Sequence, residues 1–198
     1  MTGSRTETSP KSPRVSAQPG RARESAIEEM LRVDHAGEYG AVRIYAGQLA
    51  VLRNMPGNED LVAKLEHMAE DEEVHLARFN ELINERHVRP TAFAPVLHVA
   101  GFALGAATAL LGEKAAHACT AAVEEVIDEH YRSQVQRLDQ MGEEEKPLRD
   151  TIEKFRLEEV EHRDEAIASG AEQAPAYPLL SGAIKAACRL AIKVSEKA

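Results

Sequence analysis

The chain has little of what a secreted, β-rich or nucleic-acid-binding protein needs. Its 198 residues include two cysteines, Cys119 and Cys188, too few for a disulfide framework, so a reducing compartment is expected. Aromatic residues make up 4%, and β-branched residues are sparse beside Ala, Leu, Glu and Arg, which disfavours a β sandwich or barrel. Only 24 Lys and Arg stand against 33 Asp and Glu. The resulting net charge of −9 disfavours a general nucleic-acid binder.

The first 24 residues differ in composition from the rest. They are rich in Ser, Thr, Pro, Gly and Arg, show no hydrophobic periodicity, and lack the apolar core of a secretory signal peptide. Because such a segment buries too little apolar surface to order itself, we expect residues 1–24 to form a disordered basic tail and residues 25–198 one domain. The alternative is an organellar transit peptide, although Pro10, Pro13 and Pro19 would interrupt its amphipathic helix.

From Ser25 onward, core-type residues recur in steps of four and three, the pattern of a helix packed in a bundle. Four such segments can be traced, at about residues 25–53, 61–86, 117–138 and 148–169. Met55-Pro56-Gly57-Asn58 is a turn signal between the first two, and Gly142 separates the last two. Two helical hairpins with short connections predict an all-α four-helix bundle.

Two further segments lie outside this pattern. Residues 91–112 contain no Asp, Glu, Lys or Arg and fit a buried crossover helix, an interfacial helix or, least favoured, a transmembrane helix. A last helix, at about residues 179–197, carries an apolar face beside a basic stripe made of Lys185, Arg189, Lys193 and Lys197. Such a stripe suits an anionic membrane surface. We therefore expect a four-helix bundle with a long hydrophobic crossover in the middle and an extra C-terminal helix.

Each bundle segment carries a glutamate in its core-facing row, and two of these are followed three residues later by histidine. The six residues are Glu38, Glu72, His75, Glu124, Glu159 and His162. Buried carboxylates need a cationic partner, and a Glu and a His at i, i+3 share one face of a helix. The first glutamate precedes the second by 34 residues, and the third precedes the fourth by 35. A lone Glu-x-x-His is usually a solvated pair, whereas two matched copies predict the two-metal carboxylate site of ferritin-like proteins.

The ligand types narrow the choice of metal. Four carboxylates and two imidazoles without a thiolate form a hard, oxygen-rich set that favours iron or manganese and leaves positions for dioxygen. Asp71 and Glu158 directly precede the motif glutamates and are either exposed charges or acceptors that orient a ligand histidine. His35 shares a face with Glu38 and is expected to be structural or to support a ligand, not to bind the metal itself. The ligands alone leave iron storage, hydroxylation and radical generation open.

Six strings along the chain are distinctive rather than compositional. They are RVDHAGEYGA at 32–41, RIYAGQLAVL at 43–52, HLARFNE at 75–81, GFALG at 101–105, TALLG at 108–112 and APAY at 174–177. Together they resemble the demethoxyubiquinone hydroxylase family of ubiquinone biosynthesis, whose members are ferritin-like di-iron monooxygenases. The resemblance covers about residues 27–197 and leaves out the N-terminal tail.

The resemblance implies a dioxygen-dependent enzyme that hydroxylates the ring of a polyprenylated demethoxyquinol. The family's iron ligands match the six residues that the spacing selects: Glu38, Glu72, His75, Glu124, Glu159 and His162. It also points to His130 and Tyr177 near the quinone ring. Tyr45 and Tyr131 share the helix faces of Glu38 and Glu124 and are further substrate candidates, with core packing as the alternative.

The expected cofactors are two iron ions, with dioxygen as co-substrate and NADH or another reductant as the electron source, since the chain lacks a flavin or dinucleotide fingerprint. A polyprenylated substrate implies peripheral binding to a membrane, on the cytoplasmic face of a bacterial inner membrane or the matrix side of the mitochondrial one. Other ubiquinone-biosynthesis proteins and a second copy of the chain are candidate partners; nucleic acid is not. The alternatives are a ferritin-like iron-binding or ferroxidase protein and a hydroxylase of a non-quinone substrate.

Overall fold

The computed structural model describes residues 19–197, which are helical apart from short connections and contain no strand. The helices are α1 (Pro19–Leu52), α2 (Glu59–Glu85), α3 (Ala94–Leu110), α4 (Glu113–Leu138), α5 (Lys146–Ala168) and α6 (Tyr177–Ser195), with two short 3-10 turns at Glu143–Glu145 and Ala171–Gln173. The prediction of an all-α chain is confirmed. Most of the expected basic tail, residues 1–18, lies outside the described residues.

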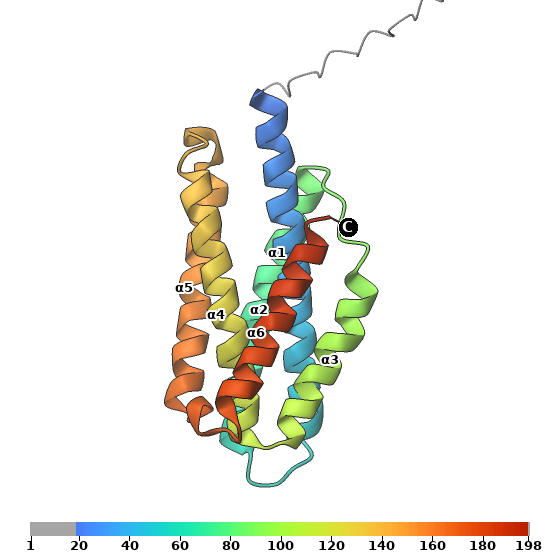
Figure 1. Ribbon diagram of the computed structural model, residues 1–198, viewed down its shortest axis with the longest axis vertical. Coiled ribbons are helices and arrows are strands. Elements are labelled where there is room, and N and C mark those ends of the chain that lie inside the picture. The colour runs from blue at the N-terminus through green and yellow to red at the C-terminus, as the bar shows by residue number, and fades with distance from the viewer. Residues whose placement is uncertain (1–18, 198) are drawn as a thin grey trace, which may run out of the picture.

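Four of the six helices form the predicted bundle. The α1–α2 hairpin and the α4–α5 hairpin run side by side, while α3 packs mainly on α1 and α6 mainly on α4 (Figure 1). The connection within each hairpin contains a glycine with positive φ, Gly57 at +85° and Gly142 at +96°, a backbone region that other residues rarely adopt. The crossover helix and the extra C-terminal helix therefore cover the α1–α4 side of the bundle.

Helix α1 begins earlier than the sequence indicates. It starts at Pro19, not near Ser25, so residues 19–24 belong to the helix and not to the expected tail. Arg23 gives a physical reason, because its guanidinium donates to Glu144 Oε2 over 2.6 Å and thereby ties the first turns of α1 to the α4–α5 connection. Composition could not reveal a contact between residues 121 positions apart.

The backbones of α3 and α1 are in direct contact, because glycines lie where the two helices meet. A Cβ added at Gly105 would lie 1.9 Å from the Ile44 carbonyl oxygen, and one added at Gly47 would lie 2.1 Å from the Phe102 carbonyl oxygen. Small residues on facing positions allow two helices to approach this closely. The contact holds α3 along α1. No helix within residues 19–197 has the length and apolar character needed to cross a membrane.

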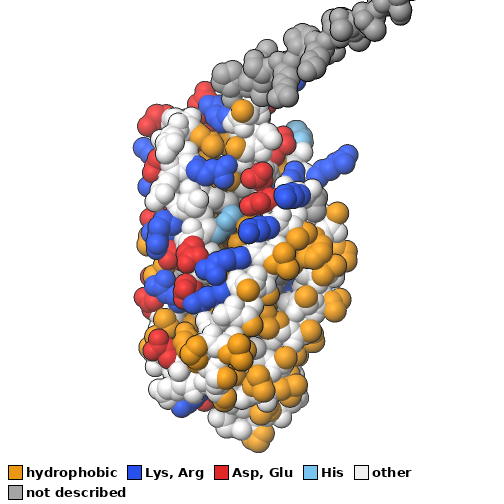
Figure 2. Space-filling model, viewed as in Figure 1, with side chains coloured by type: hydrophobic (Ala, Val, Ile, Leu, Met, Phe, Trp, Pro, Cys, Tyr) orange, Lys and Arg blue, Asp and Glu red, His pale blue; other side chains and the backbone are white. Residues whose placement is uncertain are grey.

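The outer surface of α3 and α6 carries an apolar patch (Figure 2). Its most exposed members are Val99, at 68%, and Leu110 and Leu111 at the end of α3, together with Leu179 and Leu190 on α6. We refer to these five residues as the apolar patch. Scattered exposed apolar residues are ordinary, but a patch shared by two neighbouring helices marks a surface that contacts something apolar.

Two of the four cations in the basic stripe of α6 form ion pairs with the neighbouring helix α4. Lys185 donates to Glu125 over 2.6 Å and Arg189 donates to Glu129 over 2.9 Å, so two of its four cations bind α4. Figure 2 shows basic and acidic side chains next to one another at the border of the apolar surface. Among the described residues, Lys193 and Lys197 have no acidic partner within 4.0 Å, and both are exposed. These ion pairs of Lys185 and Arg189 hold α6 on the bundle, and contact of the stripe with a membrane stays a prediction.

Candidate metal centre

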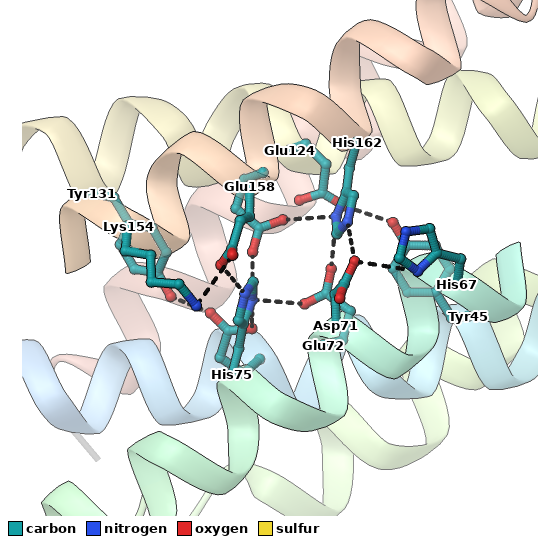
Figure 3. A network of polar contacts seen from close by, with 12 residues as sticks. Tyr45, His67, Asp71, Glu72, His75, Glu124, Tyr131, Lys154, Glu158 and His162 are labelled. Carbon is teal, nitrogen blue, oxygen red and sulfur yellow. Dashed lines mark hydrogen bonds and ion pairs between the residues drawn. The ribbon is translucent and has the colours of Figure 1, made fainter. Parts of the chain in front are cut away.

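The six predicted ligand residues meet inside the bundle, where Figure 3 labels Glu72, His75, Glu124 and His162. Two helices contribute one glutamate each, Glu38 from α1 and Glu124 from α4, and the other two contribute Glu72 with His75 and Glu159 with His162. Each is at most 6% exposed. They are buried because each occupies the core-facing row of its helix, between apolar residues that fill the layers above and below.

The two Glu-x-x-His pairs approach each other crosswise. His75 Nδ1 lies 3.0 Å from Glu159 Oε1 of the other pair. His162 Nδ1 lies 3.5 Å from Glu72 Oε1 of the other pair and 3.4 Å from Glu159 Oε2 of its own, so each histidine contacts the glutamate of the opposite helix. One ligand atom from each of Glu38, Glu72, His75 and Glu159 can be chosen so that all four lie within 4.8 Å of one another. This spacing is suited to donors around a metal ion.

The outward nitrogen of each histidine is also held crosswise. His75 Nε2 lies 3.0 Å from Glu158, and His162 Nε2 lies 3.2 Å from Asp71. Each carboxylate can accept a hydrogen bond from the Nε2–H of the histidine beside it. The Nδ1 atom of that histidine then carries a lone pair, which faces the cluster. The structure therefore supports the orienting role for Asp71 and Glu158 over that of free surface charges.

Two buried tyrosines hold the single glutamates in the same crossed manner. The Tyr45 hydroxyl donates to Glu124 Oε1 over 3.2 Å, and the Tyr131 hydroxyl donates to Glu38 Oε1. Each tyrosine lies seven residues after the glutamate of its own helix but bonds the glutamate of the other helix. The two hairpins are thus related by an approximate two-fold arrangement.

The remaining substrate candidates lie away from the cluster. His130 is half-buried, with Nε2 at 3.2 Å from Asp34 Oδ1, and Gln134 donates to the same Asp34 oxygen over 2.7 Å. Tyr177, at the start of α6, packs against a cluster of buried alanines at one end of the bundle. Asp34 and Gln134 were not predicted, because both lie beside the traced core-facing rows and a lone polar residue there does not indicate burial.

Proton affinities in the cluster are strongly perturbed. Burial and the charge of Glu159 raise the pKa of Glu72 and of Glu124 well above the usual range. Burial opposes ionisation of Glu159 as well, but the imidazoles of His162 and His75, whose Nδ1 atoms lie 3.4 and 3.0 Å from its oxygens, hold its pKa at about 2. The same proximity to Glu159 raises the pKa of His75 to about 11 and that of His162 to about 12, although burial alone would lower both. Four carboxylates in one enclosed space therefore draw positive charge to it.

The donor atoms that point inward fit a metal ion. Glu72 Oε1, both oxygens of Glu159 and Nδ1 of both histidines find no hydrogen-bond partner of acceptable geometry among the described residues. A buried polar atom without a partner is costly, and a hard cation would satisfy these oxygens and nitrogens together. The residues present therefore suit iron or manganese.

An apolar cavity of about 280 Å³ lies on the α1–α4 side of the cluster. Gly37 directly precedes Glu38 on α1, Ala41 follows it by three residues, and Val123 directly precedes Glu124 on α4; all three line the cavity. Leu97, Gly101 and Leu104 of α3 and Ala187, Cys188 and Ala191 of α6 form its walls. These small residues could not be predicted as cavity walls, because glycine and alanine in a helix carry no chemical signal.

Comparison with known proteins places the chain in a family. The family model described as "Ubiquinone biosynthesis protein COQ7" matches residues 25–195. The 3-demethoxyubiquinol 3-hydroxylase of Rhodospirillum rubrum is 61% identical over 171 residues, which cover 86% of this chain and 78% of that protein. The mitochondrial NADPH-dependent 3-demethoxyubiquinone 3-hydroxylase of Homo sapiens is 49% identical over 174 residues, 87% of this chain and 78% of that protein.

A third relative, the mitochondrial 5-demethoxyubiquinone hydroxylase of Saccharomyces cerevisiae, is 39% identical over 188 residues, 89% of this chain and 80% of that protein. The segment matched by the family model contains all six residues of the cluster as well as α3 and α6. These matches confirm the resemblance seen in the sequence. The chain therefore belongs to the COQ7 family of ubiquinone biosynthesis proteins.

Proposed function

We propose that the protein is a membrane-associated di-iron monooxygenase that hydroxylates the ring of a polyprenylated demethoxyubiquinol. The observation that carries the proposal is a buried carboxylate–histidine cluster close to an apolar cavity: Glu38, Glu72, His75 and Glu159 are spaced for one metal ion, and His162 and Glu124 lie beside them. The printed activities of the relatives from Rhodospirillum rubrum and Homo sapiens support the substrate class. A storage protein would need the cluster but has no use for a ring-sized apolar cavity beside it.

The proposed reaction converts a ring C–H bond to C–OH and consumes one dioxygen, two electrons and two protons, with the second oxygen atom released as water. Iron would supply the activation of dioxygen that side chains alone cannot provide. NADH or another reductant would supply the electrons. The name of the human relative, which is NADPH-dependent, supports a nicotinamide in this role.

Each part of the cluster has a distinct task in this proposal. Glu72 with His75 and Glu159 with His162 would hold the two ions from α2 and α5, and Asp71 and Glu158 fix the imidazole rings. Glu38 and Glu124 would complete the ligand set from α1 and α4, beside the cavity. The hydroxyls of Tyr45 and Tyr131 keep these two carboxylates oriented. A direct role of Tyr131, His130 or Tyr177 in substrate binding stays a prediction.

The cavity and the apolar patch together suit a substrate with a ring and a long isoprenoid tail. A volume of about 280 Å³ is at the lower end of small-molecule sites, enough for a ring but not for a polyprenyl chain. The walls of the cavity belong to α3 and α6, the helices that also carry the apolar patch. The tail would therefore remain in the bilayer while the ring enters between these helices. We place the protein peripherally, on the cytoplasmic face of a bacterial inner membrane or the matrix side of a mitochondrial one.

The experiment compares Glu159→Ala with Glu161→Ala, a change at an exposed residue of the same helix. We expect wild type and Glu161→Ala to bind about two irons per chain and to hydroxylate demethoxyubiquinol, detected as the mass gain of one oxygen. Glu159→Ala should lose iron and activity while its far-UV circular dichroism is retained. Full iron content and activity in Glu159→Ala would refute the assignment. Iron binding by the wild type without quinol hydroxylation would favour a ferroxidase.

A further inference from the structure

A row of buried polar side chains leads away from the Tyr45 end of the cluster. Thr120 and His117 lie four and seven residues before Glu124, so the three share one face of α4 on successive turns. Gln48, one turn after Tyr45 on α1, donates to the Ala116 carbonyl oxygen over 3.1 Å and so lies beside them. Gln48, Thr120 and His117 are each at most 1% exposed. The metal centre described above makes no use of them.

These side chains are short of hydrogen-bond partners. Gln48 Oε1, Thr120 Oγ1 and both ring nitrogens of His117 find none among the described residues. Burial lowers the pKa of His117, so its ring is neutral near pH 7 and has one donor and one acceptor to satisfy. Unpaired buried polar groups destabilise a fold, and proteins usually satisfy such groups with internal water.

One end of the row lies at the cluster and the other lies near the protein surface. At the inner end, Thr120 lies near the Tyr45 hydroxyl, which donates to Glu124 Oε1 over 3.2 Å. At the outer end, His117 Nε2 lies 4.0 Å from Glu113 Oε1, whose side chain is 57% exposed. That separation exceeds a hydrogen bond and suits one bridging water.

Charged groups on the other helices also face the outer end. Lys64 of α2 and Glu165 of α5 act on His117 electrostatically and pair with each other over 3.4 Å. Both are partly exposed. Solvent and exchangeable protons therefore reach the end of the bundle at which His117 is buried.

At the opposite end of the bundle, Asp34 and Gln134 occupy the positions that correspond to Thr120 and Gln48, so a buried polar pair occurs at both ends. Only the position that corresponds to His117 differs. Under the approximate two-fold arrangement, Glu38 corresponds to Glu124, and the residue seven positions before it is Leu31, which is completely buried. Leucine fills that layer without any polar atom. A histidine at the matching position of α4 consequently calls for a chemical explanation.

We propose that Gln48, Thr120 and His117 bind a row of internal water molecules that carries protons from the surface at Glu113 to the Glu124 end of the cluster. The inference rests on the proposed function, in which hydroxylation breaks the O–O bond, forms one C–O bond and takes up two protons with the two electrons. The cavity for the ring is lined almost wholly by apolar side chains, which pass no protons. Along the polar row, each hydroxyl or water accepts a proton on one side and donates one on the other, so no group changes its net charge.

The test uses the full-length, iron-loaded protein. In a high-resolution crystal structure we expect ordered waters within about 3.5 Å of Thr120 Oγ1 and of a His117 nitrogen. Thr120→Val removes the hydroxyl at constant shape, and His117→Leu introduces the residue found at the counterpart position. The matched control is Thr108→Val, because the buried Thr108 hydroxyl bonds carbonyls of its own helix, Leu104 and Gly105, both over 3.0 Å.

Both variants in the row should lose these waters, keep their iron and retain the KM for the quinol. Their kcat should fall by about fivefold or more, with a solvent deuterium isotope effect larger than that of the wild type, because proton transfer becomes limiting. Thr108→Val should match the wild type in both measures. A dry row in the wild-type crystal structure would overturn the proposal. So would an unchanged kcat and isotope effect in both variants of an active enzyme, which leaves the proposed function intact. An inactive wild type would refute the proposed function and the proton role together.

Discussion

The backbone contact between α1 and α3 is expected to be intolerant of a single methyl group at Gly105. A Cβ there would lie 1.9 Å from Ile44 O and 2.8 Å from Ile44 C. Carbon and oxygen normally meet at about 3.3 Å, so the methyl group is roughly 1.4 Å too close to a backbone that cannot turn aside. Gly105→Ala therefore requires α3 to move away from α1.

The magnitude follows from two opposing effects. Overpacking in a tight interior costs about 1–3 kcal/mol, and a clash of backbone with backbone belongs at the upper end. Replacing a helical glycine with alanine gains about 1 kcal/mol in helix propensity. The net destabilisation is about 2 kcal/mol, which corresponds to a fall in Tm of about 4–8 °C for a chain of this size.

The assay is thermal unfolding followed by far-UV circular dichroism, with Gly182→Ala as the control. Gly182 lies within α6, and a Cβ there would meet nothing within 4 Å. The control should therefore gain stability from helix propensity alone and unfold at or above the wild-type temperature. If Gly105→Ala unfolds as late as Gly182→Ala, the close contact does not hold α3 and the reasoning is refuted.

Three further results are expected. Asp71→Asn should weaken iron binding by about 10–100-fold in a competitive chelator titration, because His162 loses its charged acceptor; unchanged affinity would contradict the orienting role. Val99→Asp with Leu190→Asp should reduce flotation with phosphatidylglycerol-containing vesicles, whereas Met55→Asp, at an exposed residue of the α1–α2 turn, should not; equal flotation of all three proteins would exclude the apolar patch as the contact. Burial raises the pKa of Asp34, so ionising it opposes folding, and wild type should lose urea stability relative to Asp34→Asn as pH rises above the usual aspartate range; a pH-independent difference would contradict this.

The sequence predicted the centre of the molecule better than its edges, for physical reasons. Glu38, Glu72, Glu124 and Glu159 interrupt rows of core residues, and a periodic pattern reports which face of a helix is buried. It does not report which residues meet across helices. The hydrogen bonds of Lys185 to Glu125 and of Asp71 to His162 join residues that are 60 and 91 positions apart in the sequence. The bond of Arg23 to Glu144 joins residues that are 121 positions apart. Such partners depend on how the hairpins dock.

The placement of α3 and α6 against α1 and α4 has a consequence for engineering. Both histidines, and the carboxylates that orient them, come from α2 and α5, whereas the cavity is bounded by the other four helices. Side chains such as Leu97, Leu104 and Ala191 can therefore be exchanged to reshape the cavity without replacing a predicted ligand or its supporting hydrogen bond. A scaffold divided in this way offers separate control over which molecule enters and over the metal chemistry that it meets.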